Sequence, residues 1–244
     1  MKIALIHGLS SKPAFETLKA SCEKSIGRPI TLVYWADLMG YKSYPDFDAS
    51  KPYSTWEKLI SPIRGVIRRS FKEVVETSLN PFYGWVSKRT NELSLKIYGN
   101  FLPDLDRYFN HGYREAVKDR LRKAFPCDIL IAHSMGAIIA ADLLADGTHR
   151  VTKLITIGAP LGLGFIKEQL DLTYARHETL RRAIRTWINI YDPLDAVSLD
   201  HDLSDEFTGV KDIRVRNLQI DETGARHYHS LYGYLKTPEL QAAI

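Results

Sequence analysis

The sequence predicts an α/β protein, a three-layer sandwich built on a mostly parallel sheet of about six strands. Short apolar runs, rich in β-branched residues, alternate along the chain with longer helical patterns, as expected when parallel strands are joined by crossover helices. The composition is 45% hydrophobic and 25% charged, which excludes a disordered or fibrous chain. One block departs from the alternation, so we predict an α/β core of residues 1–39 and 111–244 with a helical cap insertion at 40–110.

Six apolar runs predict strands that are covered on both faces. They are residues 2–7, 30–35, 128–132, 151–157, 185–191 and 213–220. Between them, apolar residues recur three and four positions apart and predict helices. These are residues 13–25, 112–125, 135–146, 165–183 and 229–242.

Charge and cysteine content narrow the class of protein. A formal net charge of +4 is small for 244 residues and predicts no nucleic-acid partner. Cys22 and Cys127 are too few for a disulfide framework. The residues that follow Met1 lack a signal-peptide core, and polar residues interrupt the apolar run 128–145, so we expect a cytoplasmic protein without a membrane span.

A serine lies at the corner between a predicted strand and a predicted helix. Ser134 follows the apolar run 128–132, and a tight turn there would project its hydroxyl away from the sheet. Such a strained turn needs small neighbours, and Ala132 and Gly136 are small. The next amide, that of Met135, would lie at a helix N-terminus and could donate to an oxyanion. We therefore predict a nucleophile; the alternative is a buried serine that caps a helix.

On these residues the chain resembles the α/β-hydrolase superfamily, and within it the lipase- and esterase-like serine hydrolases. The family's usual turn has glycine on both flanks of the serine, whereas this chain has Ala132 on the first, and His133 is the variable residue. The resemblance covers the six strands and their helices but not residues 40–110. It implies a sheet that lacks the family's first antiparallel hairpin, because the strand at 2–7 already has the role of the family's third strand.

The resemblance also implies an oxyanion hole after the first strand. In the family a His-Gly pair follows the corresponding strand, and His7-Gly8-Leu9 matches that pattern. Gly8 would let the chain turn so that the amide of Leu9 faces the site beside that of Met135. The alternative is a plain turn after a strand.

A serine needs a histidine to accept its proton and a carboxylate to orient that histidine. The family order is serine, acid, histidine, and two acids follow the strand at 185–191. Asp195 is favoured because an Asp-x-Val stretch is common at that place in lipase-like members, and Val197 completes it. Asp192 precedes a proline and is more typical of a turn, but it stays open as the alternative acid.

Two histidines follow the last predicted strand and could act as the base. His229 is favoured because the similar hydrolases have a histidine, a small residue and then an aromatic, here Tyr232, with a proline, here Pro238, later. His227 stays open as the alternative base, or as a surface histidine. Elsewhere, Asp200-His201-Asp202 is too short a pattern to predict a metal site, so we expect no metal and no cofactor.

The block at 40–110 holds 13 of the 26 aromatic residues and carries eleven basic and eight acidic residues, a net charge of +3. Within it, apolar residues at helical spacing, from Trp56 to Leu79, form one stripe, with basic residues such as Arg64 and Arg68 opposite. Three interpretations stay open: an added helical layer, a lid that shapes an apolar acyl pocket over Ser134, and a basic surface that contacts anionic membranes weakly.

The sequence thus predicts a serine hydrolase that cleaves a carboxylic ester with a hydrophobic acyl group through an acyl-enzyme on Ser134. The alternatives are an acyltransferase or thioesterase with the same triad, and a non-catalytic lipid- or protein-binding module on a hydrolase-like scaffold.

Overall fold

The structure is a computed structural model, and it describes residues 1–8, 14–39, 104–109, 112–195, 197–198, 200–217 and 228–244. All of them belong to one compact unit. The predicted cap at 40–110 lies outside the described residues except for 104–109, which are helical. Leu9 and His227 also lie outside them.

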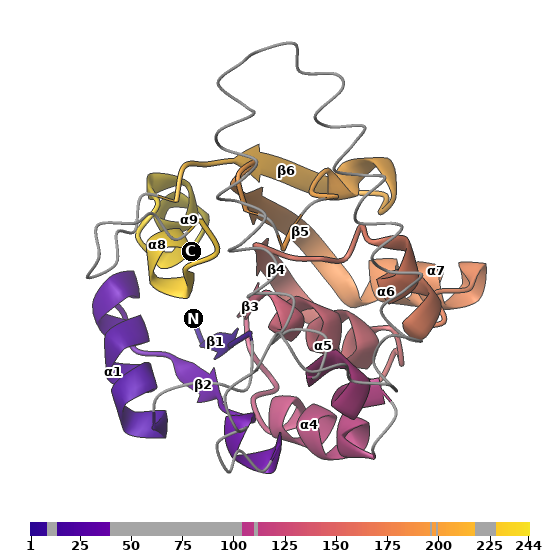
Figure 1. Ribbon diagram of the computed structural model, residues 1–244, viewed down its shortest axis with the longest axis horizontal. Coiled ribbons are helices and arrows are strands. Elements are labelled where there is room, and N and C mark those ends of the chain that lie inside the picture. Colours follow the sequence, from indigo (N-terminus) through magenta and orange to yellow (C-terminus); the bar gives the residue numbers. More distant parts are fainter. Residues whose placement is uncertain (9–13, 40–103, 110–111, 196, 199, 218–227) are drawn as a thin grey trace, which may run out of the picture. The chain divides into compact units, whose positions relative to one another are not determined.

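A six-stranded parallel sheet forms the centre of the described unit (Figure 1). Its strands are β1 (Ile3–Ile6), β2 (Thr31–Val33), β3 (Ile129–His133), β4 (Val151–Ile157), β5 (Ile184–Tyr191) and β6 (Val210–Arg214). The order across the sheet is β2-β1-β3-β4-β5-β6, and every neighbouring pair is parallel. The predicted fold class is confirmed.

The last strand begins and ends earlier than the sequence predicts, at 210–214 instead of 213–220. Because β6 lies at an edge of the sheet, its residues are half-buried or exposed. It therefore contains polar residues such as Lys211 and Asp212 and does not form an apolar run in the sequence. After β6, the N–H of Val215 still donates to Tyr191 O, but the N–H of Asn217 donates to a carboxylate, so the ladder has ended.

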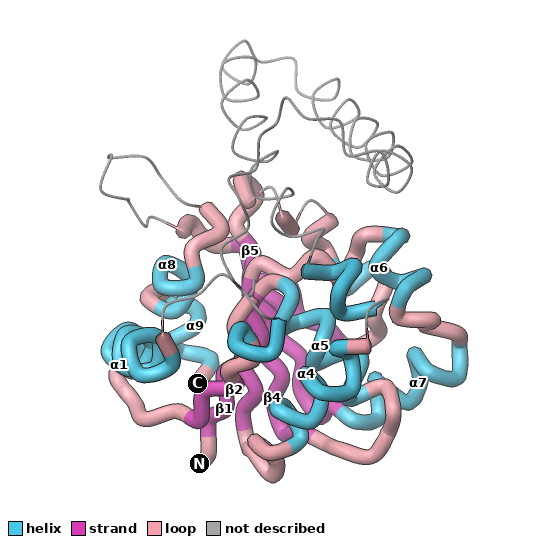
Figure 2. Tube along the Cα trace, turned by 60° about the horizontal axis from the view of Figure 1, so that its bottom comes forward, coloured by secondary structure: helices cyan, strands magenta, loops and turns pink. Residues whose placement is uncertain are grey.

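Helices cover both faces of the sheet, as Figure 2 shows for α1, α8 and α9 on one side and α4, α5 and α7 on the other. The first group comprises α1 (Phe15–Ile26), α8 (Leu231–Leu235) and α9 (Pro238–Ala243). The second comprises α4 (Tyr113–Arg122), α5 (Met135–Leu144) and α7 (Tyr174–Ala183), with α6 (Gly164–Gln169) before α7. Alternate residues of β1 and β3, such as Leu5 and Ile131, pack with α1, α8 and α9 in one core.

Two helices predicted as single are each divided in two. The break between α6 and α7 contains Asp171 in a left-handed conformation (φ 47°), and Thr173 caps α7 by accepting a bond from Arg176 N. The break between α8 and α9 precedes Pro238, whose ring has no N–H to continue a helix but suits its first position. Apolar residues keep their helical spacing across both breaks, so the pattern predicts one helix where the structure has two.

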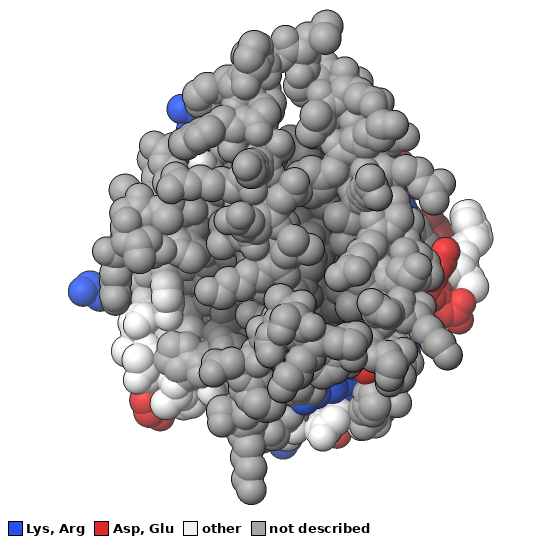
Figure 3. Space-filling model, viewed as in Figure 1, with Lys and Arg blue, Asp and Glu red and all other residues white. Residues whose placement is uncertain are grey.

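The described surface carries both signs of charge. Acidic and basic side chains are both visible among the described residues on the face that Figure 3 presents. Among the described helices, none is long and apolar enough to cross a membrane.

Candidate active site

Three side chains from distant parts of the sequence meet at the carboxyl edge of the sheet. Ser134 directly follows β3, Asp195 lies in the loop after β5, and His229 lies just before α8. Ser134 Oγ is 2.8 Å from His229 Nε2, and His229 Nδ1 is 2.8 Å from Asp195 Oδ2. Ser134 and Asp195 are buried, and the side chain of His229 is 12% exposed. The structure therefore joins these residues in one hydrogen-bonded chain.

The serine is held at a strained turn between β3 and α5. Its φ of 55° and ψ of −124° lie in a region that residues with a side chain rarely adopt, at a cost of about 1–3 kcal/mol. The turn is fixed on both sides, because the Ser134 N–H donates to Ile157 O and the Ser134 carbonyl accepts from Ala137 N. This backbone conformation directs the hydroxyl toward His229, as the sequence predicts for such a turn.

The small residues beside the serine allow close approach of the backbone. A Cβ on Gly136 would lie 2.7 Å from the carbonyl oxygens of Ile6 and His7, so only glycine lets α5 begin against the end of β1. A Cβ on Gly8 would lie 2.8 Å from Ser134 Cβ. Ala132 is buried in β3. The end of β1 and the turn that carries Ser134 are thus in direct contact.

One predicted oxyanion donor is described, and the other is not. Met135 is the first residue of α5, so its N–H belongs to the helix-terminal groups that have no partner within the helix, where the helix dipole favours negative charge. Leu9 lies outside the described residues, although Gly8, which precedes it, lies against Ser134.

His7 is turned toward β2. The Trp35 N–H donates to His7 Nε2 at 3.2 Å, the Trp35 indole donates to His7 O at 3.1 Å, and the two rings stack with centroids 5.0 Å apart. Because a backbone N–H only donates, Nε2 is the unprotonated nitrogen of a neutral His7 ring. His7 thus anchors the end of β1 to the segment after β2, a role for Trp35 that the sequence does not indicate.

Asp195 accepts hydrogen bonds at both carboxylate oxygens. Oδ1 accepts from Val197 N at 3.0 Å, and Oδ2 accepts from His229 Nδ1 and from the hydroxyl of Tyr234, which is 2.7 Å away. Gly158, after β4, has a left-handed φ of 54°, and a Cβ there would lie only 2.7 Å from Asp195 Oδ2. Sequence reasoning missed both Tyr234 and Gly158; the only local signal is a glycine directly after a predicted strand.

Asp192, the alternative acid, joins the loops around Ser134, Asp195 and His229. Its Oδ1 accepts from Leu194 N at 2.8 Å and its Oδ2 from Asn217 N at 2.6 Å. Burial, and secondarily the charge of Asp195, raises the pKa of Asp192 above its usual range despite these bonds. Asn217 Nδ2 in turn donates to the carbonyl oxygens of Tyr228 and Ser230, on either side of His229. Asp192 therefore supports the segment that carries the histidine, whereas Asp195 contacts the imidazole.

His133, the variable residue of the turn, is buried beside His229. The two rings are 4.7 Å apart at an angle of 31°, and His133 Nε2 lies 3.2 Å from His229 O. This contact joins the turn that carries Ser134 to the loop that carries His229. The alternative base, His227, lies outside the described residues.

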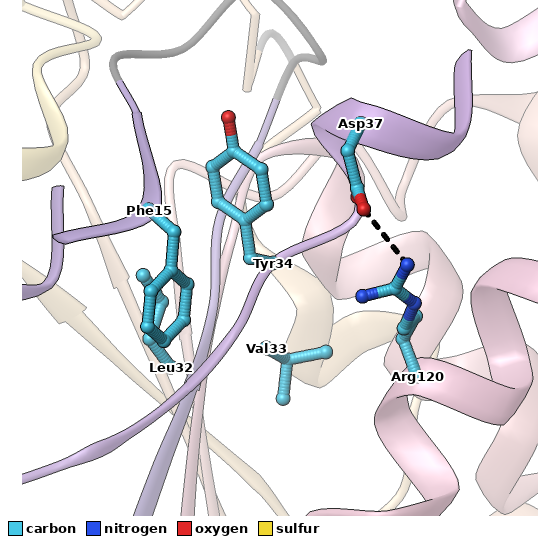
Figure 4. Close-up of a pocket in the computed structure, with 6 residues that line it drawn as sticks. All are labelled: Phe15, Leu32, Val33, Tyr34, Asp37 and Arg120. Carbon is cyan, nitrogen blue, oxygen red and sulfur yellow. Dashed lines mark hydrogen bonds and ion pairs between the residues drawn. The ribbon is translucent and has the colours of Figure 1, made fainter. Parts of the chain in front are cut away.

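A separate pocket of about 350 Å³ lies at the β2 edge of the sheet (Figure 4). Its lining is apolar on one side and carries an ion pair on the other, in which Arg120 Nη2 is 2.7 Å from Asp37 Oδ2. The lining residues are Phe15, Leu32, Val33, Tyr34, Asp37 and Arg120. Ser134, Asp195 and His229 are not among them.

Within the described ranges, no group of three or more histidine, cysteine, aspartate or glutamate side chains could hold a metal ion. Comparison with protein-family models, with curated proteins and with solved structures found no significant match.

Proposed function

We propose that this protein is a serine hydrolase that cleaves carboxylic esters through an acyl-enzyme on Ser134. The observation that carries the proposal is the hydrogen-bonded chain from Ser134 Oγ through His229 to Asp195, with 2.8 Å at each link. Nucleophile, base and orienting acid are each within hydrogen-bond reach of the next, which is the geometry that activates a serine.

In the first half-reaction, Ser134 Oγ attacks the ester carbonyl carbon while His229 Nε2 takes the hydroxyl proton. The tetrahedral intermediate collapses, the bond to the alkoxy oxygen breaks, and His229 returns the proton to the leaving alcohol. In the second half-reaction, His229 takes a proton from water, the hydroxide attacks the acyl carbon, and Ser134 leaves with its proton restored. The carboxylate of Asp195 orients the imidazole and stabilises the imidazolium of each step.

The negative charge on the carbonyl oxygen would be stabilised at the N-terminus of α5. The Met135 N–H supplies one donor, and the Leu9 N–H is the expected second. Each such donor is typically worth about 10²–10³ in kcat.

The same features support membership of the α/β-hydrolase superfamily as a proposal. The nucleophile follows β3, the acid follows β5 and the histidine precedes α8, which is the order of the family's triad along the chain. The sheet between β2 and β6 is parallel throughout, in keeping with a family member that lacks the first hairpin. The proposed substrate has a hydrophobic acyl group, as the aromatic-rich residues 40–110 suggest.

Labelling with a fluorophosphonate probe tests this function directly, because the probe forms a covalent bond only with an activated serine. We expect stoichiometric labelling of the wild type and none of Ser134→Ala. Ser25→Ala is the matched control, since Ser25 bonds to Ser21 O within α1, and it should label as the wild type does. Equal labelling of Ser134→Ala and the wild type would contradict the proposal.

The substrate class is tested with p-nitrophenyl esters of increasing acyl length, with and without lipid vesicles. We expect rates to rise from acetyl to longer chains. A preference for acetyl with no effect of lipid would argue against a hydrophobic acyl pocket.

A further inference from the structure

Tyr234, in α8, lies against the acid of the triad. It is fully buried, and its hydroxyl is 2.7 Å from Asp195 Oδ2, the same oxygen that His229 Nδ1 contacts at 2.8 Å. The carboxylate oxygen that would orient the histidine is therefore shared between an imidazole and a phenol.

A second bond determines the direction of the first. The Asp192 N–H lies 3.0 Å from the Tyr234 hydroxyl oxygen, and a backbone N–H can only donate. The phenol oxygen accepts that bond, so its own proton is free to point at Asp195 Oδ2. Burial, together with the charge of Asp195, raises the pKa of Tyr234 well above its usual range, which keeps the phenol protonated as a donor.

Gly158 allows the side chains of Tyr234, His229 and Asp195 to lie close together. A Cβ on Gly158 would lie 3.0 Å from Tyr234 Cε2 and 3.1 Å from His229 Nδ1, as well as against the shared oxygen of Asp195. Any side chain at 158 would push the phenol, the imidazole and the carboxylate apart.

We propose that Tyr234 is a positioning residue of the triad: by donating to Asp195 Oδ2, it fixes the carboxylate and lowers the basicity of His229. A donor to a carboxylate draws off part of the negative charge that would otherwise stabilise the imidazolium. The catalytic consequence rests on the proposed function, whereas the effect on His229 does not.

The other ionisable groups around the site are the same residues in the wild type and in the proteins altered at position 234. The carboxylate of Asp192 lies in the same loop as Asp195, the charge of Arg214 acts on Asp192, and the ring of His133 packs on His229. A change in the titration of His229 on altering Tyr234 therefore reports the loss or the strengthening of the phenol bond.

The test measures the second-order rate of fluorophosphonate labelling against pH for the wild type and two proteins altered at position 234. Tyr234→Phe removes the donor, so the acid limb should move to higher pH by about 0.5–1 unit. The plateau rate should fall about 5–10-fold, the factor that one hydrogen bond is typically worth. The second protein carries 3-fluorotyrosine at 234, a stronger donor, and its acid limb should move to lower pH.

Tyr108→Phe is the matched control. Tyr108 is also fully buried and donates to a buried carboxylate, with its hydroxyl 2.7 Å from Asp142 Oδ2. We expect lower thermal stability but an unchanged pH profile. If both proteins altered at 234 keep the wild-type acid limb, the proposal is wrong and Tyr234 only supports the fold. Should Tyr234→Phe fail to fold, the direction of the shift in the fluorotyrosine protein decides.

Failure of the proposed function gives a different result. If the wild type takes no label, the hydrolase proposal fails, and the pKa of His229 is then followed through the NMR signal of its Cε1–H. An unchanged pKa of His229 in Tyr234→Phe would overturn the positioning role whether or not the protein is an enzyme.

Discussion

Two buried carboxylates of this protein differ in the charge of the groups around them. Asp142, in α5, is surrounded by cations: Arg114 Nε and Arg176 Nη2 lie 2.7 and 3.0 Å from its oxygens, and Lys118 Nζ lies 3.9 Å away. Both carboxylates accept a hydrogen bond from a buried phenol, Tyr108 for Asp142 and Tyr234 for Asp195. The other partners of Asp195 are an imidazole and a backbone N–H. Removal of a carboxylate that is paired with permanent cations leaves buried charge uncompensated, whereas a carboxylate that faces an imidazole can serve proton transfer.

The pKa values of Asp142 and of Asp192, which lies three residues before Asp195, also differ in direction. Burial by itself would raise the pKa of Asp142, but hydrogen bonds from Arg114 and Tyr108 and the nearby positive charges lower it overall. Asp192, which lies in the loop of the candidate site, has a raised pKa because burial dominates there. The α4–α5–α7 side of the molecule is thus electrostatically compensated, whereas the edge of the sheet keeps a costly carboxylate.

The largest expected effect is the loss of activity in Asp195→Asn. The amide would hold His229 in the wrong tautomer, so the rate of ester hydrolysis should fall by about 10⁴-fold. Asp192→Asn, in the same loop, should lose less than about tenfold, the factor of one altered hydrogen bond. A greater loss in Asp192→Asn than in Asp195→Asn would reverse the assignment of the acid.

The complementary change is Asp142→Asn, which should damage stability instead. It removes the buried counter-charge of Arg114 and Arg176, although Arg176 and Lys118 keep Asp146 as a partner, so the free energy of unfolding should fall by about 3 kcal/mol. Urea unfolding measures the loss, and the labelling rate per folded molecule should match that of the wild type. A large loss of labelling in the folded variant would mean that the two regions are coupled.

The stability difference between the wild type and Asp142→Asn should depend on pH. Because the folded pKa of Asp142 is lowered, its carboxylate stabilises the folded state fully above the unfolded value of about 3.9. That contribution is lost as pH falls through the folded pKa. The difference in unfolding free energy should therefore be constant from pH 7 to about pH 5 and shrink below about pH 4. A constant difference down to pH 3 would contradict the lowered pKa.

The smallest expected effect is that of alanine at Gly158. Comparison with alanine at Gly27 distinguishes backbone strain from crowding of the site. Gly158 and Gly27 both have a left-handed φ, of 54° and 73°, but a Cβ on Gly27 would meet nothing within 4 Å. Each alanine substitution should cost about 1–2 kcal/mol in stability. Only Gly158→Ala should also slow labelling, by about tenfold or more, because its methyl group would meet Asp195 and His229. Equal labelling rates in the two variants would show that the triad tolerates the methyl group.

The sheet was predictable because buried parallel strands read as continuous apolar runs, as residues 128–132 and 151–157 do. The grouping of the residues that follow the strands was predictable because the carboxyl ends of parallel strands share one edge of the sheet. β6 was misplaced because an edge strand keeps polar residues. The divided helices were missed because Asp171 and Pro238 act on the backbone without changing the spacing of apolar residues.

The sequence by itself determined the fold class and indicated Ser134, because strand patterns and small residues at a turn are local properties. It placed two acids and two histidines after strands, and the resemblance to lipase-like hydrolases favoured Asp195 and His229 among them. Only the tertiary structure decided which acid contacts the imidazole, since Asp192 and Asp195 are three residues apart and differ by the direction of their side chains. It also revealed Tyr234, in α8, and Gly158, which follows β4; both lie against Asp195 although they are far apart in the sequence. Hydrogen bonds between segments far apart in sequence produce no periodic pattern of residues from which they could be predicted.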